Sequence, residues 1–77
     1  MLIKICGITN SGDARDAVAA GATALGFNFY SKSPRYVTPE ALAEWIGEVP
    51  SGVLRVGVFV NASAAEVSKC VEMCRLD

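Results

Sequence analysis

The residues best suited to chemistry in this sequence are a lysine and a cysteine close to its start. Lys4 and Cys6 lie two positions apart in a short apolar segment that stops at Gly7. Alternate side chains of a strand share one face, so these two groups would lie about 6.5 Å apart along it. A nearby ammonium favours the thiolate form of a cysteine, which could then act as a base near neutral pH. Position alone favours an ordinary buried cysteine instead.

A second candidate is Arg35, within the polar segment 30–36. Its planar guanidinium could hold a carboxylate or a phosphate through two parallel hydrogen bonds. Loops are commonly polar, so the charge taken alone is more typical of a solvated side chain. Ligands of α/β folds bind at the carboxyl ends of the strands, which adds Asn28 and Asn61 to the positions of interest.

The cysteine count argues against a metal, and the glycine pattern against a nucleotide cofactor. Cys6, Cys70 and Cys74 have no histidine with which to form a zinc site or a catalytic pair, and three cysteines cannot all pair as disulfides. We therefore expect reduced thiols in a cytoplasmic protein. Cys70 and Cys74 are spaced for helix packing, and neither glycine-rich phosphate motif occurs. We expect no metal and no cofactor.

Composition points to a packed domain with a small-molecule partner. Hydrophobic residues make up 52% of the 77 residues, and the net charge is -1. Nothing in that balance favours nucleic acid or an anionic membrane as a partner. No apolar run approaches the roughly 18 residues that a membrane span requires, and the start does not have the pattern of a signal peptide.

The elements that must position these residues alternate between strand and helix. Each helix has a start signal: Asn10 or Ser11 for the first, Thr38 followed by Pro39 for the second, and a capping box from Ser63 to Glu66 for the third. Gly21 is expected to end the first helix. The expected strands are 2–6, 24–29 and 54–60, and the expected apolar helix stripes are Leu42, Trp45, Ile46 and Val49, then Val67, Cys70, Val71 and Cys74.

This βαβαβα order predicts an α/β fold with a parallel sheet, in which the apolar third strand is covered on both faces. An eight-unit barrel takes about 250 residues, so residues 1–77 are interpreted as a single partial domain, the N-terminal three βα units of a barrel. Three strands leave two open edges. We expect this fragment to form a homo-oligomer through them.

The sequence also resembles a known family. Lys4-Ile5-Cys6-Gly7-Ile8-Thr9, Ser33-Pro34-Arg35-Tyr36-Val37 and Val56-Gly57-Val58-Phe59-Val60-Asn61 occur in the order and spacing of the N-terminal part of phosphoribosylanthranilate isomerases. The resemblance runs from Ile3 to about Asn61. It implies a (βα)8 TIM barrel of tryptophan biosynthesis that performs an Amadori rearrangement of N-(5-phosphoribosyl)anthranilate to 1-(2-carboxyphenylamino)-1-deoxyribulose 5-phosphate without a cofactor.

The resemblance also implies roles for two residues. Cys6 would be the general base, and Arg35 would lie beside the anthranilate carboxylate. The family's general acid and its phosphate loops belong to later strands, so the 77-residue chain alone is expected to be inactive. Two alternatives stay open: a related phosphate-binding barrel acting on another sugar phosphate, and a self-associating fragment without catalytic function.

Overall fold

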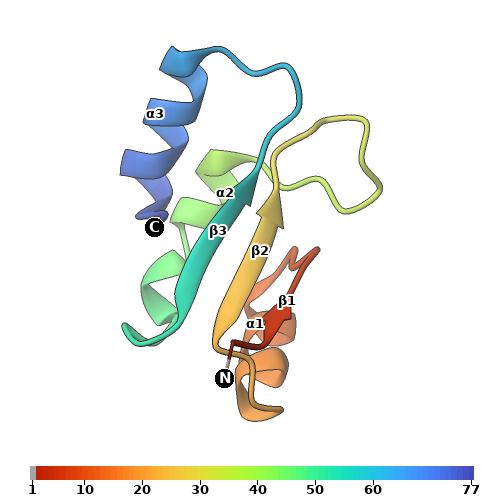
Figure 1. Cartoon of the computed structure of the whole chain (residues 1–77), viewed down its shortest axis with the longest axis vertical. Coiled ribbons are helices and arrows are strands. Elements are labelled where there is room, and N and C mark those ends of the chain that lie inside the picture. Colours follow the sequence, from red (N-terminus) through yellow and green to blue (C-terminus); the bar gives the residue numbers. More distant parts are fainter. Residues whose placement is uncertain (1) are drawn as a thin grey trace.

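The computed structural model describes residues 2–77 and arranges them in two layers, a parallel sheet with helices packed on one of its faces (Figure 1). The sheet has the order β1-β2-β3, so β2 is its central strand. None of the helices in this part of the chain has the length and apolar character that crossing a bilayer requires. In chain order the elements are β1 (Lys4–Ile5), α1 (Ser11–Ala19), β2 (Ala24–Asn28), α2 (Pro39–Ala43), the 3-10 helix η1 (Ile46–Glu48), β3 (Leu54–Val58) and α3 (Ala64–Cys74).

The helices begin where their capping residues predict. The Asn10 side chain, rather than that of Ser11, accepts a hydrogen bond of 2.8 Å from a backbone N–H in the first turn of α1. Thr38 and Ser63 cap α2 and α3 in the same way, each at 3.1 Å. These bonds satisfy donors that a helix leaves free at its start. Gly21, with φ of 106°, follows the end of α1 as expected.

The core lies between the sheet and the helix layer. Leu25 and Phe27 of β2 are fully buried, as is Leu42 of α2. The Phe27 ring meets Trp45 edge to face, with 6.0 Å between the ring centroids. Trp45 is therefore a core anchor, and β2 is held firmly on its helix side.

Four expected elements differ from those observed. β1, β2 and β3 are shorter than the expected strands 2–6, 24–29 and 54–60. The helix expected from Pro39 to Val49 is broken at Glu44 and Trp45 into α2 and η1. Trp45, at the break, has φ of -128°, outside the helical range, and its ring packs on Phe27.

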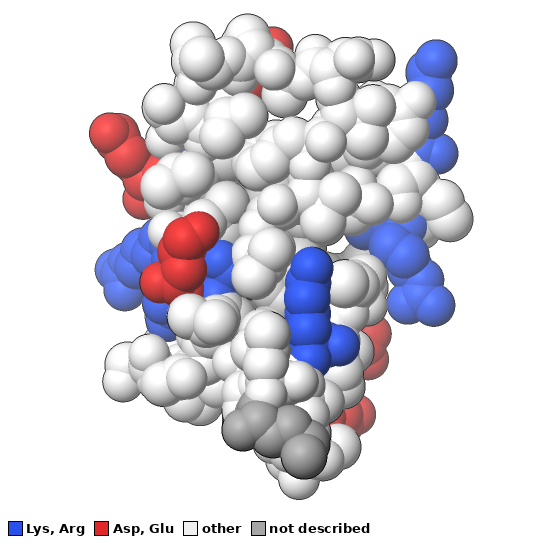
Figure 2. Space-filling view, in the orientation of Figure 1, with Lys and Arg blue, Asp and Glu red and all other residues white. Residues whose placement is uncertain are grey.

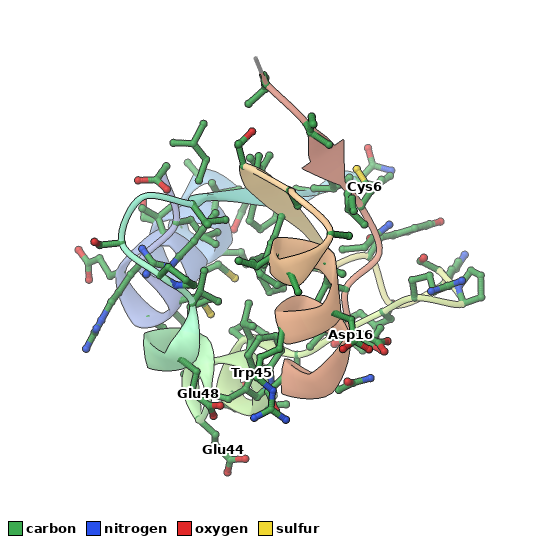
Figure 3. All side chains as sticks on the ribbon, turned by 90° about the horizontal axis from the view of Figure 1, so that it is seen from below. Cys6, Asp16, Glu44, Trp45 and Glu48 are labelled. Carbon is green, nitrogen blue, oxygen red and sulfur yellow. The ribbon has the colours of Figure 1, made fainter. Side chains whose placement is uncertain are left out.

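The other face of the sheet is open within residues 2–77, so the expectation that β3 is covered on both faces is wrong for this part of the chain. All the helices lie on one side of the strands (Figures 1 and 3). Leu54 and Val60 are each 45% exposed, and Leu2 is 68% exposed. Figure 2 shows the opposite face as largely uncharged. An uncovered apolar face of this kind is unusual for parallel strands.

Two of the cysteines belong to the packing of α3, as expected, whereas Val71 of the expected stripe is 38% exposed. Burial raises the pKa of the Cys70 thiol, and the neighbouring Glu40 carboxylate raises it further. Burial likewise raises the pKa of Cys74 to about 11, and this thiol donates a hydrogen bond to the Pro39 carbonyl at 3.3 Å. Both groups are therefore uncharged at neutral pH and unsuited to act as bases.

Candidate active site

Cys6 lies one residue beyond β1, at the carboxyl end of that strand, and it is exposed. Figure 3 shows its sulfur beside the tip of β1, well away from Trp45 in the helix layer. Leu25 and Phe27 of the neighbouring strand are buried under the helices, so the residue between them, Gly26, faces the opposite way. Cys6 lies over this residue, on the open face of the sheet.

Contacts at Gly26 place Cys6 and Lys4 together. A Cβ added to Gly26 would lie 3.0 Å from the Sγ of Cys6, 3.1 Å from the Cα of Cys6 and 3.3 Å from the Cε of Lys4. Both side chains therefore lie over Gly26 on the same face of the sheet, as expected for alternate residues of one strand. The backbone fixes this approach, because the Ile8 N–H donates a hydrogen bond to the Gly26 carbonyl at 3.1 Å.

Arg35 meets the same segment through Gly7. Gly7 has φ of 78°, a conformation that side chains rarely adopt, and its missing Cβ leaves room for the stem of Arg35. A Cβ there would lie 3.3 Å from the Cγ of Arg35. The structure thus packs the stem of Arg35 on the residue that follows Cys6, although the two candidates lie far apart in the sequence.

The loop that carries Arg35 is held by Asn28 at the end of β2. The Asn28 side chain accepts a hydrogen bond of 2.9 Å from the Tyr30 N–H. The backbone carbonyl of Asn28 accepts another of 2.9 Å from the Val37 N–H. Within the loop, the Ser33 hydroxyl accepts a bond of 3.1 Å from the Arg35 N–H. Asn28 therefore acts as a scaffold for the loop, which explains the polar residue at this strand end.

The guanidinium of Arg35 is available to a ligand. Arg35 is exposed, and within residues 2–77 the one ion pair found is between Lys69 and Glu40, which lies elsewhere. A planar fork without a carboxylate partner suits a bidentate anion. Cys6 and Lys4 supply a thiol and an ammonium over Gly26, and Arg35 packs on the next residue, Gly7, so the arrangement could hold an acidic substrate and move a proton.

The structure does not join every strand-end residue to this surface. Asn61, with φ of 54°, follows β3 and lines a separate cavity of about 340 Å³ with Tyr30, Glu66 and Lys69. Neither Cys6 nor Arg35 lines that cavity. Among the described residues, no three acidic, cysteine or histidine side chains cluster in a way that could hold a metal ion.

Sequence reasoning missed Gly26, where an added Cβ would meet Cys6. A signal was present, since a glycine inside a strand often marks a close approach of another backbone or a ligand. What approaches it could not be read from the pattern, because the register between β1 and β2 decides it. That register pairs Lys4 with Ala24 and Ile5 with Leu25.

The sequence profile of a family described as N-(5'phosphoribosyl)anthranilate (PRA) isomerase matches residues 3–77. Among curated relatives, the N-(5'-phosphoribosyl)anthranilate isomerase of Solibacter usitatus is 53% identical over 77 residues, all of this chain and 37% of the relative. That of Citrifermentans bemidjiense is 55% identical over 75 residues, 97% of this chain and 36% of the relative. The chain thus spans less than two fifths of these relatives.

Solved structures give the same match in three dimensions. The phosphoribosyl anthranilate isomerase of Thermotoga maritima superposes with a TM-score of 0.93 at 45% identity, covering 99% of this chain and 38% of that one. The Thermus thermophilus enzyme gives a TM-score of 0.91 at 43% identity, covering 100% and 38%. A phosphoribosyl anthranilate isomerase in complex with reduced 1-(o-carboxyphenylamino)-1-deoxyribulose 5-phosphate gives 0.93 at 45% identity, covering 99% and 40%.

Proposed function

This chain belongs to the N-(5'-phosphoribosyl)anthranilate isomerase family, and from this premise we propose that it is the N-terminal three-unit part of a barrel enzyme of tryptophan biosynthesis. The proposed reaction is the cofactor-free rearrangement of N-(5'-phosphoribosyl)anthranilate to 1-(2-carboxyphenylamino)-1-deoxyribulose 5-phosphate. The proposal is carried by the packing of the Arg35 stem on Gly7, the residue that follows Cys6, in a segment that matches the family from residue 3 onward.

In the proposed mechanism, Cys6 is the general base. An acid outside this chain first protonates the furanose oxygen, and the ring opens to a protonated Schiff base as the C–O bond breaks. The Cys6 thiolate then takes the proton from C2, and the electron pair left behind neutralises the iminium nitrogen to give an enolamine. The enolamine becomes the ketone by proton transfer. A positioned base typically contributes 10²–10⁴-fold to such a step.

Arg35 is proposed to bind the anthranilate carboxylate. Its guanidinium is exposed and free of carboxylate partners in residues 2–77, and its stem rests against Gly7. A bidentate pair would fix both the position and the orientation of the aromatic ring relative to the neighbouring thiol. Binding at this end of the substrate would place C2 near the base, which is the positioning that such a reaction requires.

Replacing Arg35 should therefore weaken substrate binding. In the intact protein, Arg35→Ala should raise KM by about tenfold or more, since charge-assisted hydrogen bonds contribute roughly 1.5–3 kcal/mol. Arg35→Lys should recover part of the loss, because an ammonium cannot form two parallel bonds. The measurement is the loss of anthranilate fluorescence during turnover, and Arg15→Ala, at an exposed site on α1, is the matched control. If KM is unchanged in both Arg35 variants, Arg35 is a solvated loop side chain and does not bind the substrate.

The proposal includes the cytoplasm as the site of action. Its support is that all three cysteines are free thiols in the structure, as expected in a reducing compartment. The small-molecule substrate would be the partner of the intact enzyme, and self-association is proposed for the 77-residue chain by itself.

A further inference from the structure

We propose that Gly26 is a positioning residue for the base, the position on β2 that lets Cys6 lie close enough to the central strand to reach its substrate. This inference deepens the proposed function and rests on it, because Cys6 is its base. Gly26 does not touch the substrate in this account. It acts through Cys6 and Lys4, which cross the open face of the sheet directly above it.

A side chain at Gly26 would crowd Cys6. Carbon atoms of packed groups lie about 3.5–4.0 Å apart, so a methyl group at Gly26 would force Cys6 to shift by a few tenths of an ångström. Its neighbours would be the Sγ at 3.0 Å and the Cα at 3.1 Å. The thiol could turn away, but the Cα is backbone and could move only with its strand. An added methyl group must therefore displace the base itself.

The crowding at Gly26 lies at the site rather than in the core. Gly26 faces away from the helices, and its carbonyl accepts the Ile8 N–H at 3.1 Å, which holds the segment after Cys6 against β2. Gly57 of β3 is equally crowded, but by Leu76 and Phe59 at 2.8 Å on the helix side. Gly47 has nothing within 4 Å. The chain thus offers one glycine at the site, one in the core and one in open space.

The test is the change Gly26→Ala, made in the intact protein and also in its Cys6→Ser variant. In the native background we expect kcat to fall by roughly 3- to 10-fold with little change in KM, since a misplacement of about 1 Å can cost 10²-fold and the crowding here requires a shift of a few tenths of an ångström. In the Cys6→Ser background we expect no further loss, because the base that Gly26 positions is gone. Gly47→Ala should leave kcat unchanged. Gly57→Ala should lower the melting temperature and have little effect on kcat.

Two outcomes would overturn the proposal. One is a Gly26→Ala protein with native kcat; the other is an equal loss of kcat in both backgrounds, which would show a general structural effect. If Cys6→Ser itself kept native turnover, the proposed base would fail, and this distinguishes the failure of the function from the failure of the positioning role.

A stability measurement keeps the test decisive if Gly26→Ala folds poorly. Thermal unfolding of Gly26→Ala is then compared in native and Cys6→Ala backgrounds. Removal of the Sγ should make the alanine better tolerated, with a smaller drop in melting temperature. An equal drop in both backgrounds would contradict the contact with the thiol.

Discussion

If the intact protein is the proposed isomerase, its Cys6→Ser variant is expected to bind substrate almost normally and to turn it over 10²–10⁴ times more slowly, the range that general base catalysis commonly supplies. A serine hydroxyl is nearly the size of a thiol and fits the same space above Gly26. It is a far weaker acid, so almost none of it is ionised near neutral pH and little base is present to take the proton from C2. The loss should therefore fall on kcat and leave KM nearly unchanged.

The natural control for this variant is Cys70→Ala. Cys70 lies on α3, is 6% exposed and belongs to the core on the opposite side of the sheet. Its replacement should lower the melting temperature while turnover at a permissive temperature stays native. A Cys6→Ser enzyme that keeps more than half of its turnover would show that another group is the base.

The second large effect concerns the 77-residue chain as an isolated molecule, which should self-associate and show no turnover. Its sheet has two edges. On β3, Asp77 forms two hydrogen bonds of 2.8 Å with the backbone of Arg55, one through its side chain and one through its own N–H. The open face exposes Leu2, Leu54 and Val60, and each Å² of apolar surface in water costs about 25 cal/mol. Pairing of edges or stacking of open faces between copies would remove that exposure.

Sedimentation at low micromolar concentration tests the first half of this prediction, and the fluorescence assay tests the second. Leu54→Lys should shift the chain toward the monomer, because it places a charge on the face that copies would share. Arg75→Lys, at an exposed site after α3, should not. A monomer that unfolds cooperatively would contradict the assembly argument, and measurable turnover would show that the three units suffice for catalysis.

The sequence predicted the framework of the fold because its signals are local. The capping side chains of Asn10, Thr38 and Ser63 each bond a backbone N–H three residues ahead, so residue identity alone indicates where a helix begins. The break after α2 depends on a tertiary contact instead. Trp45 leaves the helical conformation, with φ of -128°, and its ring packs on Phe27 of β2. The periodicity of apolar residues in a sequence does not indicate that contact.

The candidate site, too, could be predicted from local sequence only in part. The motifs place Cys6 and Arg35 at strand ends, and strand order then brings them to one edge of the sheet. The packing of Arg35 beside this segment depends on the positive φ of Gly7, and the position of Cys6 over β2 depends on the missing side chain of Gly26. Both are matters of register and backbone geometry, which residue types suggest only as a glycine in an unexpected position.

The central claim is that this chain supplies the base of an isomerase, and a chimera tests it most directly. Residues 1–77 would replace the corresponding segment of the Thermotoga maritima enzyme, with which they superpose over 99% of their length. We expect a folded chimera to consume N-(5'-phosphoribosyl)anthranilate, and we expect its Cys6→Ser form to bind the reduced product analogue yet turn substrate over at least about 10²-fold more slowly. A folded chimera without turnover, or one equally active with serine at this position, would contradict it.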